Sequence, residues 1–248
     1  MIDIHTHVLP GIDDGSDSME TSLEMLAMAA DSGVDTLVTT PHCNIPGEFD
    51  NYVSEELKEL WQRLESETRR ARIPVRLCQG MEIFATRELP ELLSGGRAWT
   101  LNHTNYFLTE FSFGEDPGFC WDILQECRSR GFHPIIAHPE RYYFVQDDPQ
   151  IAYEWCRAGY GLQINKGSLL GRFGRRARIT ADLLTEHGLV ACVASDAHSA
   201  FQRTTDMGEV REYLTEAYGE RYAHLFLEEN PQRILSGREL LGFEPAPF

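Results

Sequence analysis

The chain has 248 residues, of which 42% are hydrophobic and 25% charged, close to the averages for soluble globular proteins. Its net charge of −17 disfavours broad binding of nucleic acid, because an acidic chain repels the phosphate backbone. No apolar run approaches the roughly 20 residues that a membrane-spanning helix needs, so we expect no membrane insertion. The net negative charge has a second interpretation: some of the carboxylates are metal ligands, which look uncompensated because the sequence does not show bound cations.

The six cysteines form no C-x-x-C pair and show no zinc-finger spacing. The chain begins directly with a strand-like segment, Met1-Ile2-Asp3-Ile4, and not with a basic leader and an apolar stretch. We therefore expect a reduced, cytoplasmic enzyme; an exported protein without its leader is the alternative.

Short β-rich runs alternate with longer amphipathic stretches, which indicates βα units and a parallel sheet. The predicted strands cover residues 2–5, 34–39, 75–79, 106–110, 133–137, 161–164 and 189–194. The predicted helices cover residues 19–32, 55–72, 119–129, 149–158, 179–187, 206–218, 221–228 and 231–235, with Asn230-Pro231 as the start of the last. This order predicts one α/β domain over residues 1–248, built as a barrel or near-barrel. An open doubly wound sheet is the alternative, but it needs a Gly-rich loop after the first strand.

Ionisable side chains gather at the ends of the predicted strands, where β/α barrels carry their active sites. Six strands end in such groups: His5-Thr6-His7, Thr40-Pro41-His42, Gly80-Met81-Glu82, Glu110, Ala137-His138-Pro139-Glu140-Arg141 and Ser195-Asp196-Ala197-His198. Ionisable groups in a buried barrel mouth cost free energy unless they are paired or bind metal. Mixed imidazole and carboxylate ligands suit Zn²⁺, Mn²⁺ or Fe, so the pattern predicts a metal centre.

The spacing within two of these groups supports convergence on one pocket. His5 and His7 are two residues apart, so on a strand both point to the same face. Asp196 and His198 repeat this spacing on the last strand, which a barrel brings beside the first. The loop after His7 adds Asp13-Asp14-Gly15, which is either a simple turn or a source of a further ligand. The remaining histidines are expected to be structural: His103, His133, His187 and His224.

Two other types of hydrolase are excluded because the sequence lacks the motifs that they require. His42-Cys43 is similar to the start of the cysteine-dependent phosphatase loop, which requires an arginine six residues after the cysteine. Position 49 is Phe49, and the next arginine is Arg63. The chain also has no G-x-S-x-G elbow of a serine hydrolase.

The ordered motifs resemble the polymerase-and-histidinol-phosphatase (PHP) superfamily, and within it the bacterial capsule-locus protein-tyrosine phosphatases of the CpsB/CapC type. The likeness extends to the ending Glu229-Asn230-Pro231-Gln232-Arg233-Ile234. It implies a distorted seven-stranded TIM-like barrel, (β/α)7, with three divalent metal ions, Mn²⁺ favoured and Fe or Zn²⁺ as alternatives.

The resemblance also implies how the ligands divide among the three ions. The first ion would take His5, His7, Glu82 and Asp196. The second would share Glu82 and add Glu110 and His138. The third would take Asp14, His42 and His198.

Arg141 matches the family's phosphate-binding arginine, and Arg203 matches a second one in the loop after His198. Such enzymes dephosphorylate the tyrosine-rich tail of a partner kinase that controls capsule or exopolysaccharide export. Bound cations would supply hydroxide by lowering the pKa of water towards ~7, while Arg141 neutralises charge on the phosphoryl oxygens. His42 or His198, where free of metal, would protonate the leaving phenolate, which needs little help with a pKa near ~10.

Three alternatives stay open at this point. The first is a small-molecule phosphatase of the same superfamily, acting on histidinol phosphate or a similar monoester. The second is a non-catalytic metal-binding module that docks on a kinase. The third is an amidohydrolase, which usually has a bridging lysine where this chain has Glu82 and Glu110. Lys166, at the sixth strand end, departs from the small polar residue expected there; it is a surface lysine or a positive charge near the phosphate.

Overall fold

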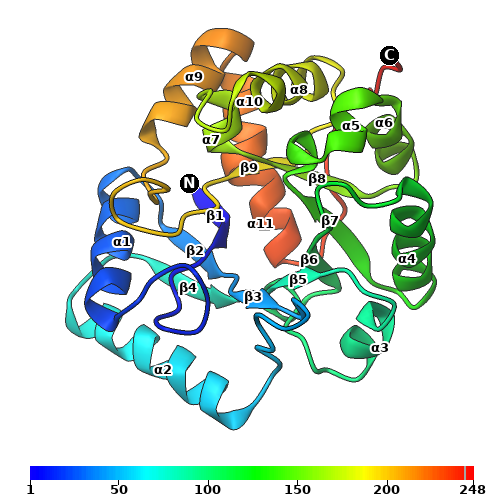
Figure 1. The fold of residues 1–248 in the computed structure, drawn as a ribbon. Coiled ribbons are helices and arrows are strands. Elements are labelled where there is room, and N and C mark those ends of the chain that lie inside the picture. The colour runs from blue at the N-terminus through cyan, green and yellow to red at the C-terminus, as the bar shows by residue number, and fades with distance from the viewer. Residues whose placement is uncertain (243) are drawn as a thin grey trace.

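The computed structural model describes residues 1–242 and 244–248, in which short parallel strands alternate with helices (Figure 1). The strands are β1 (Ile2–Thr6), β2 (Thr36–Thr39), β3 (His42–Cys43), β4 (Arg76–Gln79), β5 (Glu82–Phe84), β6 (Tyr106–Glu110), β7 (His133–Ala137), β8 (Gly161–Asn165) and β9 (Cys192–Ala194). One sheet has the order β1-β2-β4, and the other has the order β3-β5-β6-β7-β8-β9. All of these pairings are parallel.

The second and third predicted strands are each interrupted, which divides β2 from β3 and β4 from β5. Pro41 has no N–H to continue the ladder after β2. Gly80 follows β4 so closely packed that a Cβ would stand 2.8 Å from Val38 Cγ1. The segments that follow β1 and β9 lie side by side, since the His7 N–H donates to the Ala197 carbonyl at 2.8 Å. The parallel α/β architecture thus agrees with the predicted fold class, with the strands of the described residues divided between two sheets.

Helices lie around the strands (Figure 1). They are α1 (Met19–Asp31), α2 (Glu55–Arg70), α3 (Leu89–Ser94), α4 (Pro117–Ser129), α5 (Tyr143–Asp147), α6 (Gln150–Arg157), α7 (Lys166–Leu169), α8 (Arg175–Glu186), α9 (Gly208–Tyr218), α10 (Glu220–His224) and α11 (Asn230–Leu235), with the 3-10 turns η1 (Leu101–His103) and η2 (Pro139–Arg141) and the π-helical η3 (Leu225–Glu229). Side-chain caps set several starts. Asp116 accepts the Phe119 N–H at 2.9 Å, so α4 begins at Pro117, two residues before its predicted start.

A helix segment, α11, begins at Asn230 as predicted, but it is not a free helix start. η3 runs directly into α11, and Asn230 has helical dihedral angles. Its side-chain oxygen accepts the Leu241 N–H at 2.9 Å, and its amide donates to the Ala191 carbonyl at 2.8 Å. Asn230 therefore joins the C-terminal segment to the chain entering β9, because a buried side-chain amide needs such partners.

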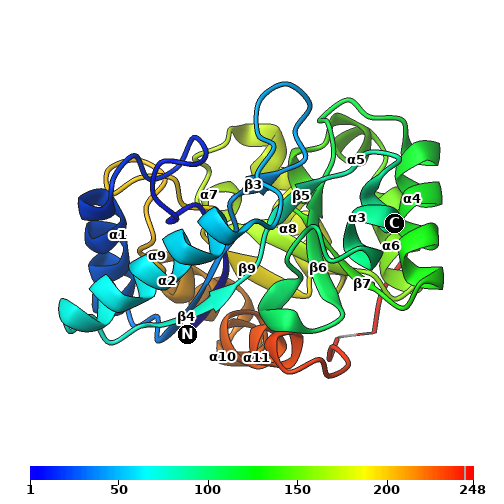
Figure 2. The same ribbon diagram turned by 90° about the horizontal axis from the view of Figure 1, so that it is seen from below.

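The apolar interior and the ionisable mouth lie on one face of the strands. In β6, Tyr106, Leu108 and Glu110 alternate onto the same face. The first two belong to a buried cluster that also contains Ile135 and Ile234, from β7 and α11. Figure 2 shows α10 and α11 at one end, near the N-terminus, and the segment after β3 at the other. Apolar packing thus occupies the end where the strands begin, and ionisable groups occupy the end where they stop.

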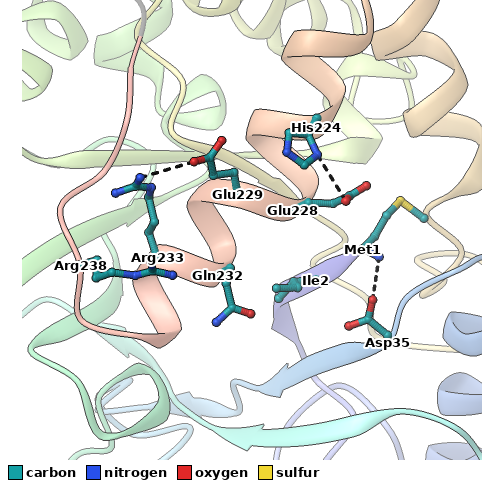
Figure 3. Close-up of a pocket in the computed structure, with 9 residues that line it drawn as sticks. All are labelled: Met1, Ile2, Asp35, His224, Glu228, Glu229, Gln232, Arg233 and Arg238. Atoms are coloured by element: carbon teal, nitrogen blue, oxygen red, sulfur yellow. Dashed lines mark hydrogen bonds and ion pairs between the residues drawn. The ribbon is translucent and has the colours of Figure 1, made fainter.

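A pocket of about 350 Å³ lies at the end where the strands begin (Figure 3). Its polar contacts pair Met1 with Asp35 at 3.1 Å and His224 with Glu228 at 3.3 Å. None of the predicted metal ligands lines it, and in barrels this face serves stability more than chemistry. Within residues 1–242 and 244–248, no helix has the length and apolar character of a membrane span.

Candidate metal centre

Four buried ligand atoms converge from β1 and the residue that follows it, from β5 and from the chain after β9. His5 Nε2 lies 3.3 Å from His7 Nε2 and 3.1 Å from Glu82 Oε2. Asp196 Oδ1 lies 3.5 Å from each of these imidazole nitrogens. The centre of four atoms with about this spacing lies ~2 Å from each, which is the distance of metal–imidazole and metal–carboxylate bonds. This donor set therefore fits a divalent cation.

A second group shares Glu82 with the first. His42 Nδ1 lies 3.2 Å from Glu82 Oε2 and 3.0 Å from Glu110 Oε1. On the other side, His138 Nε2 lies 2.9 Å from Glu82 Oε1 and 3.8 Å from Glu110 Oε2. The two oxygens of Glu82 thus face different imidazoles, an arrangement in which one carboxylate could bridge two cations.

The third group is formed by His7, Asp14, His42 and His198. Asp14 Oδ1 lies 3.5 Å from His42 Nε2 and 3.3 Å from His198 Nε2. The Asp14 side chain is 55% exposed, whereas the His5, Glu82 and Asp196 side chains are at most 2% exposed. The third group is therefore the part of the centre that is open to solvent.

Unusual backbone conformations aim several of these side chains. The register of β1 shifts between Asp3 and Thr6, as in a β-bulge, and bulges re-aim side chains beside active sites. His138 directly follows β7, Asp196 is the second residue after β9, and they have positive φ angles of 36° and 50°. Non-glycine residues seldom adopt this left-handed region, and such strain clusters at functional sites.

Asp13 anchors the centre from behind. Its Oδ2 accepts from His7 Nδ1 at 2.9 Å and from the His42 N–H at 3.0 Å, and its Oδ1 accepts the Gly15 N–H at 3.0 Å. The contact to Nδ1 leaves His7 Nε2 free to face the ligand group. A carboxylate on the far nitrogen of a metal-binding imidazole fixes its tautomer and raises its basicity.

A chain of amides supports the opposite side. Gln163 Oε1 lies 2.8 Å from His5 Nδ1, and Gln163 Nε2 donates to Asn165 Oδ1 at 2.9 Å. Asn165 Nδ2 then donates to Asp196 Oδ2 at 2.6 Å. Two members of the first ligand group are thus held through β8, whose end supplies no ligand of its own.

The pKa values show how strongly these groups depend on one another. Burial favours the neutral form of Glu82, but His5, His42 and His138 hold its pKa well below the usual range. Burial also opposes the charged form of His7, yet Asp13, Asp196 and Glu82 raise its pKa well above the ordinary value. The hydrogen bond with His198 lowers the pKa of Asp14 to about 2. Glu82 and Asp14 are therefore ionised at neutral pH, the form that binds cations.

Residues 1–236 match the family model described as capsular polysaccharide synthesis, CpsB/CapC. The chain belongs to the CpsB/CapC family.

Relatives of known name agree with this assignment. The chain is 33% identical to the tyrosine-protein phosphatase YwqE of Bacillus subtilis, with 100% of this chain and 96% of YwqE covered. It is 30% identical to the tyrosine-protein phosphatase CpsB of Streptococcus pneumoniae, with 95% and 98% covered. The crystal structures of these two proteins, described as unique metal-dependent tyrosine phosphatases, include a chain that superposes with a TM-score of 0.93 at 32% identity, covering 100% of this chain and 99% of that one.

The CpsB/CapC fold brings all nine predicted metal ligands together. They are His5, His7, Asp14, His42, Glu82, Glu110, His138, Asp196 and His198. The structure also places His42 beside Glu82 and Glu110, and His7 beside Asp14 and His198, which are neighbours that the predicted grouping did not include. The other four histidines lie outside the compact ligand groups found in the described residues.

The two predicted arginines border the same centre. Arg141 Nη1 lies 3.4 Å and Arg203 Nη2 2.5 Å from Asp196 Oδ2. Arg203 Nε also donates to the Asp196 carbonyl at 3.2 Å. The side chains of Arg141 and Arg203 are 21% and 30% exposed, so each can still reach a bound anion.

Lys166 is neither a surface lysine nor a charge aimed at the ligand groups. It is 2% exposed, and its ammonium donates to the carbonyl oxygens of Thr204 and Asp206. Burial lowers its pKa to about 8. Lys166 therefore fastens the loop that carries Arg203.

Asp13, Gln163 and Asn165 are the supporting residues that the sequence-based prediction missed. Asp13 lay within the Asp13-Asp14-Gly15 motif, but sequence alone did not separate the outer carboxylate from the inner one. Gln163 and Asn165 sit two apart on β8, a spacing that places both on one face. This alternation was the available signal.

Proposed function

We propose that this protein is a metal-dependent protein-tyrosine phosphatase. The observation that carries the proposal is the position of Arg141 and Arg203, both within hydrogen-bond or ion-pair distance of Asp196, a member of the first ligand group. Guanidiniums beside a cation cluster form a site for a phosphate group, because both charge types stabilise its oxygens. The full-length similarity to two tyrosine-protein phosphatases supports phosphotyrosine as the substrate.

We assign three divalent cations to the ligand groups, with Mn²⁺ favoured and Fe or Zn²⁺ as alternatives. His5, His7, Glu82 and Asp196 would hold the first, Glu82, Glu110 and His138 the second, and Asp14, His42 and His198 the third. Such ions lower the pKa of bound water towards ~7 and neutralise charge on a phosphoryl group. The geometry supports shared ligands, since Glu82 and His42 each face two groups.

The chain's own side chains would bind the phosphate group and supply a proton to the leaving group. Arg141 and Arg203 would bind its non-bridging oxygens, because a planar guanidinium can hold two oxygens at once. His42 and His198 would donate a proton to the leaving phenolate only while their Nε2 atoms are free of metal. Both nitrogens face the solvent-open Asp14, which is the side where a leaving group would depart.

The cellular role follows the family. We propose that the substrate is the phosphotyrosine tail of a bacterial tyrosine kinase that controls capsule or exopolysaccharide synthesis, and that the enzyme acts in the cytoplasm. The family description and the six unpaired cysteines support this assignment. We also propose that residues 1–248 form one domain, because one buried cluster contains side chains from Val8 to Leu227.

Metal analysis of the purified protein, combined with turnover of a phosphotyrosine peptide, tests the proposal. We expect bound divalent metal, hydrolysis that is lost with a chelator, and recovery on adding Mn²⁺. Histidinol phosphate and a phosphoserine peptide of the same sequence serve as comparison substrates. Faster hydrolysis of histidinol phosphate would favour a small-molecule phosphatase. Metal binding without any hydrolysis would favour a non-catalytic docking module.

A further inference from the structure

The ring of Phe173 contacts both arginines of the proposed phosphate site. Phe173 lies in the segment between α7 and α8. The guanidinium carbon of Arg141 is 4.6 Å from the ring centroid, and that of Arg203 is 5.6 Å from it. Arg141 also lies 4.8 Å from the Phe113 ring. Two aromatic rings and two guanidiniums therefore form one connected cluster beside Asp196.

This cluster holds two like charges close together. Both guanidiniums reach the same oxygen, Asp196 Oδ2, at 3.4 and 2.5 Å. That oxygen also accepts from Asn165 Nδ2 at 2.6 Å, and Asp196 belongs to the first ligand group. A single carboxylate therefore contacts both arginines, an amide and the metal-ligand cluster. An aromatic face attracts a cation without contributing a charge of its own. Phe173 can therefore hold both guanidiniums without reducing the positive charge that they offer to an anion.

The segment after β8 is shaped to seat this ring. A Cβ at Gly167 would stand 2.7 Å from Phe173 Cε2 and 3.2 Å from Phe173 Cζ, so only glycine leaves room for the ring. Lys166, the preceding residue, binds the carbonyl of Thr204, which is the neighbour of Arg203. The end of β8 supplies no metal ligand, yet the residues that follow it contact the site through its arginines.

We propose that Phe173 is a positioning residue that holds Arg141 and Arg203 in the orientation that binds a phosphate group. The inference rests on the proposed function, which assigns phosphate binding to these two arginines. Phe173 acts through the guanidiniums, because none of the interactions described above joins its ring directly to one of the nine predicted ligands.

The test compares F173L with F173Y in the full-length, metal-loaded protein. Leucine keeps an apolar side chain but removes the aromatic face, whereas tyrosine keeps the ring. Inorganic phosphate is the probe, measured both by calorimetric titration and as a competitive inhibitor of phosphotyrosine-peptide hydrolysis. We expect F173L to weaken phosphate binding about fivefold to tenfold, and F173Y to stay within about twofold of wild type. F119L is the matched control, because Phe119 contacts Arg87 at 5.9 Å in the same manner, away from the ligand groups.

Double substitution separates positioning from a general structural effect. If Phe173 acts through the arginines, the F173L loss shrinks when it is made in R203A or R141A. Metal content and Tm should match wild type in F173L. Wild-type phosphate affinity in F173L, or an undiminished loss in both arginine variants, would overturn the inference. If wild type binds phosphate but does not hydrolyse the phosphotyrosine peptide, the proposed function fails, while weaker phosphate binding by F173L would still support the role of Phe173.

Discussion

Replacing Asp13 with asparagine tests whether the carboxylate behind His7 sustains the metal centre. Asp13 accepts three hydrogen bonds, from His7 Nδ1, the His42 N–H and the Gly15 N–H. Asparagine has nearly the same shape but can accept with only one of its two positions. If its oxygen faces His7 and His42, its NH₂ group faces the Gly15 N–H, and two donors are opposed.

The expected magnitude follows from these contacts. Removing a carboxylate behind a metal-binding imidazole typically weakens metal binding about 10- to 100-fold, or ~1.4–2.7 kcal/mol. The opposed donors at Gly15 leave a buried group unsatisfied, which costs ~1–3 kcal/mol of folding free energy. D13N should therefore bind metal more weakly and unfold at a lower temperature, with the metal-free protein destabilised as well.

Calorimetric titration of Mn²⁺ into chelator-treated protein measures the affinity, and thermal unfolding with and without Mn²⁺ measures the stability. D17N is the matched control, because it removes the same charge from the same loop, where Asp17 is exposed and bonds only locally to Thr21. Wild-type Mn²⁺ affinity in D13N would refute the assignment of Asp13 as an outer support of the metal centre.

Three further substitutions test the rest of the centre. Burial raises the pKa of Cys43 to about 12, so its thiolate is scarce at neutral pH. C43A should therefore keep wild-type kcat/KM, and iodoacetamide should not inactivate the native enzyme. Inactivation by iodoacetamide that is abolished in C43A would contradict this expectation. H138A at saturating Mn²⁺ should lower kcat/KM by more than about 100-fold, since losing an outer support alone typically costs about 10- to 100-fold; wild-type turnover would remove His138 from the ligand set. Lys166 has a folded pKa of about 8, below its ordinary value of 10.5, so the folded protein binds fewer protons than the unfolded chain between these pH values. Stability should therefore rise across this window by up to ~3 kcal/mol relative to K166M, as measured by urea unfolding of metal-free protein at pH 7 and pH 10; a difference that does not change with pH would show that Lys166 keeps its usual pKa.

The ligand residues at the strand ends could be predicted from the sequence because their residue types alone indicate metal binding. Imidazoles and carboxylates at the ends of apolar runs identified eight of the nine residues that the fold brings together, and the ninth, Asp14, came from the loop motif after His7. The short elements were missed for a different reason. The helices α3, α5 and α7 span six, five and four residues, too few to show helical periodicity.

Side-chain partners set the remaining limit. Asn230 is the first residue of α11, but its side chain does not cap the helix and instead binds the backbone of Leu241 and Ala191. Lys166 has the residue type of a surface position, yet its ammonium is used by the loop beyond β9. In both cases a long-range contact determines what the side chain binds, and the neighbouring residues in the sequence do not indicate that contact.

The charges at the centre imply an order of binding. Five carboxylates converge there, from Asp13, Asp14, Glu82, Glu110 and Asp196, whereas the adjoining cations of the chain are the two guanidiniums of Arg141 and Arg203. At a pH above the raised imidazole pKa values, where the histidines are neutral, the metal-free protein groups carry net negative charge, which repels a phosphate dianion at short range. Bound cations reverse that sign. Phosphate should therefore bind well only after metal, and its affinity should fall on chelation even in variants that keep both arginines.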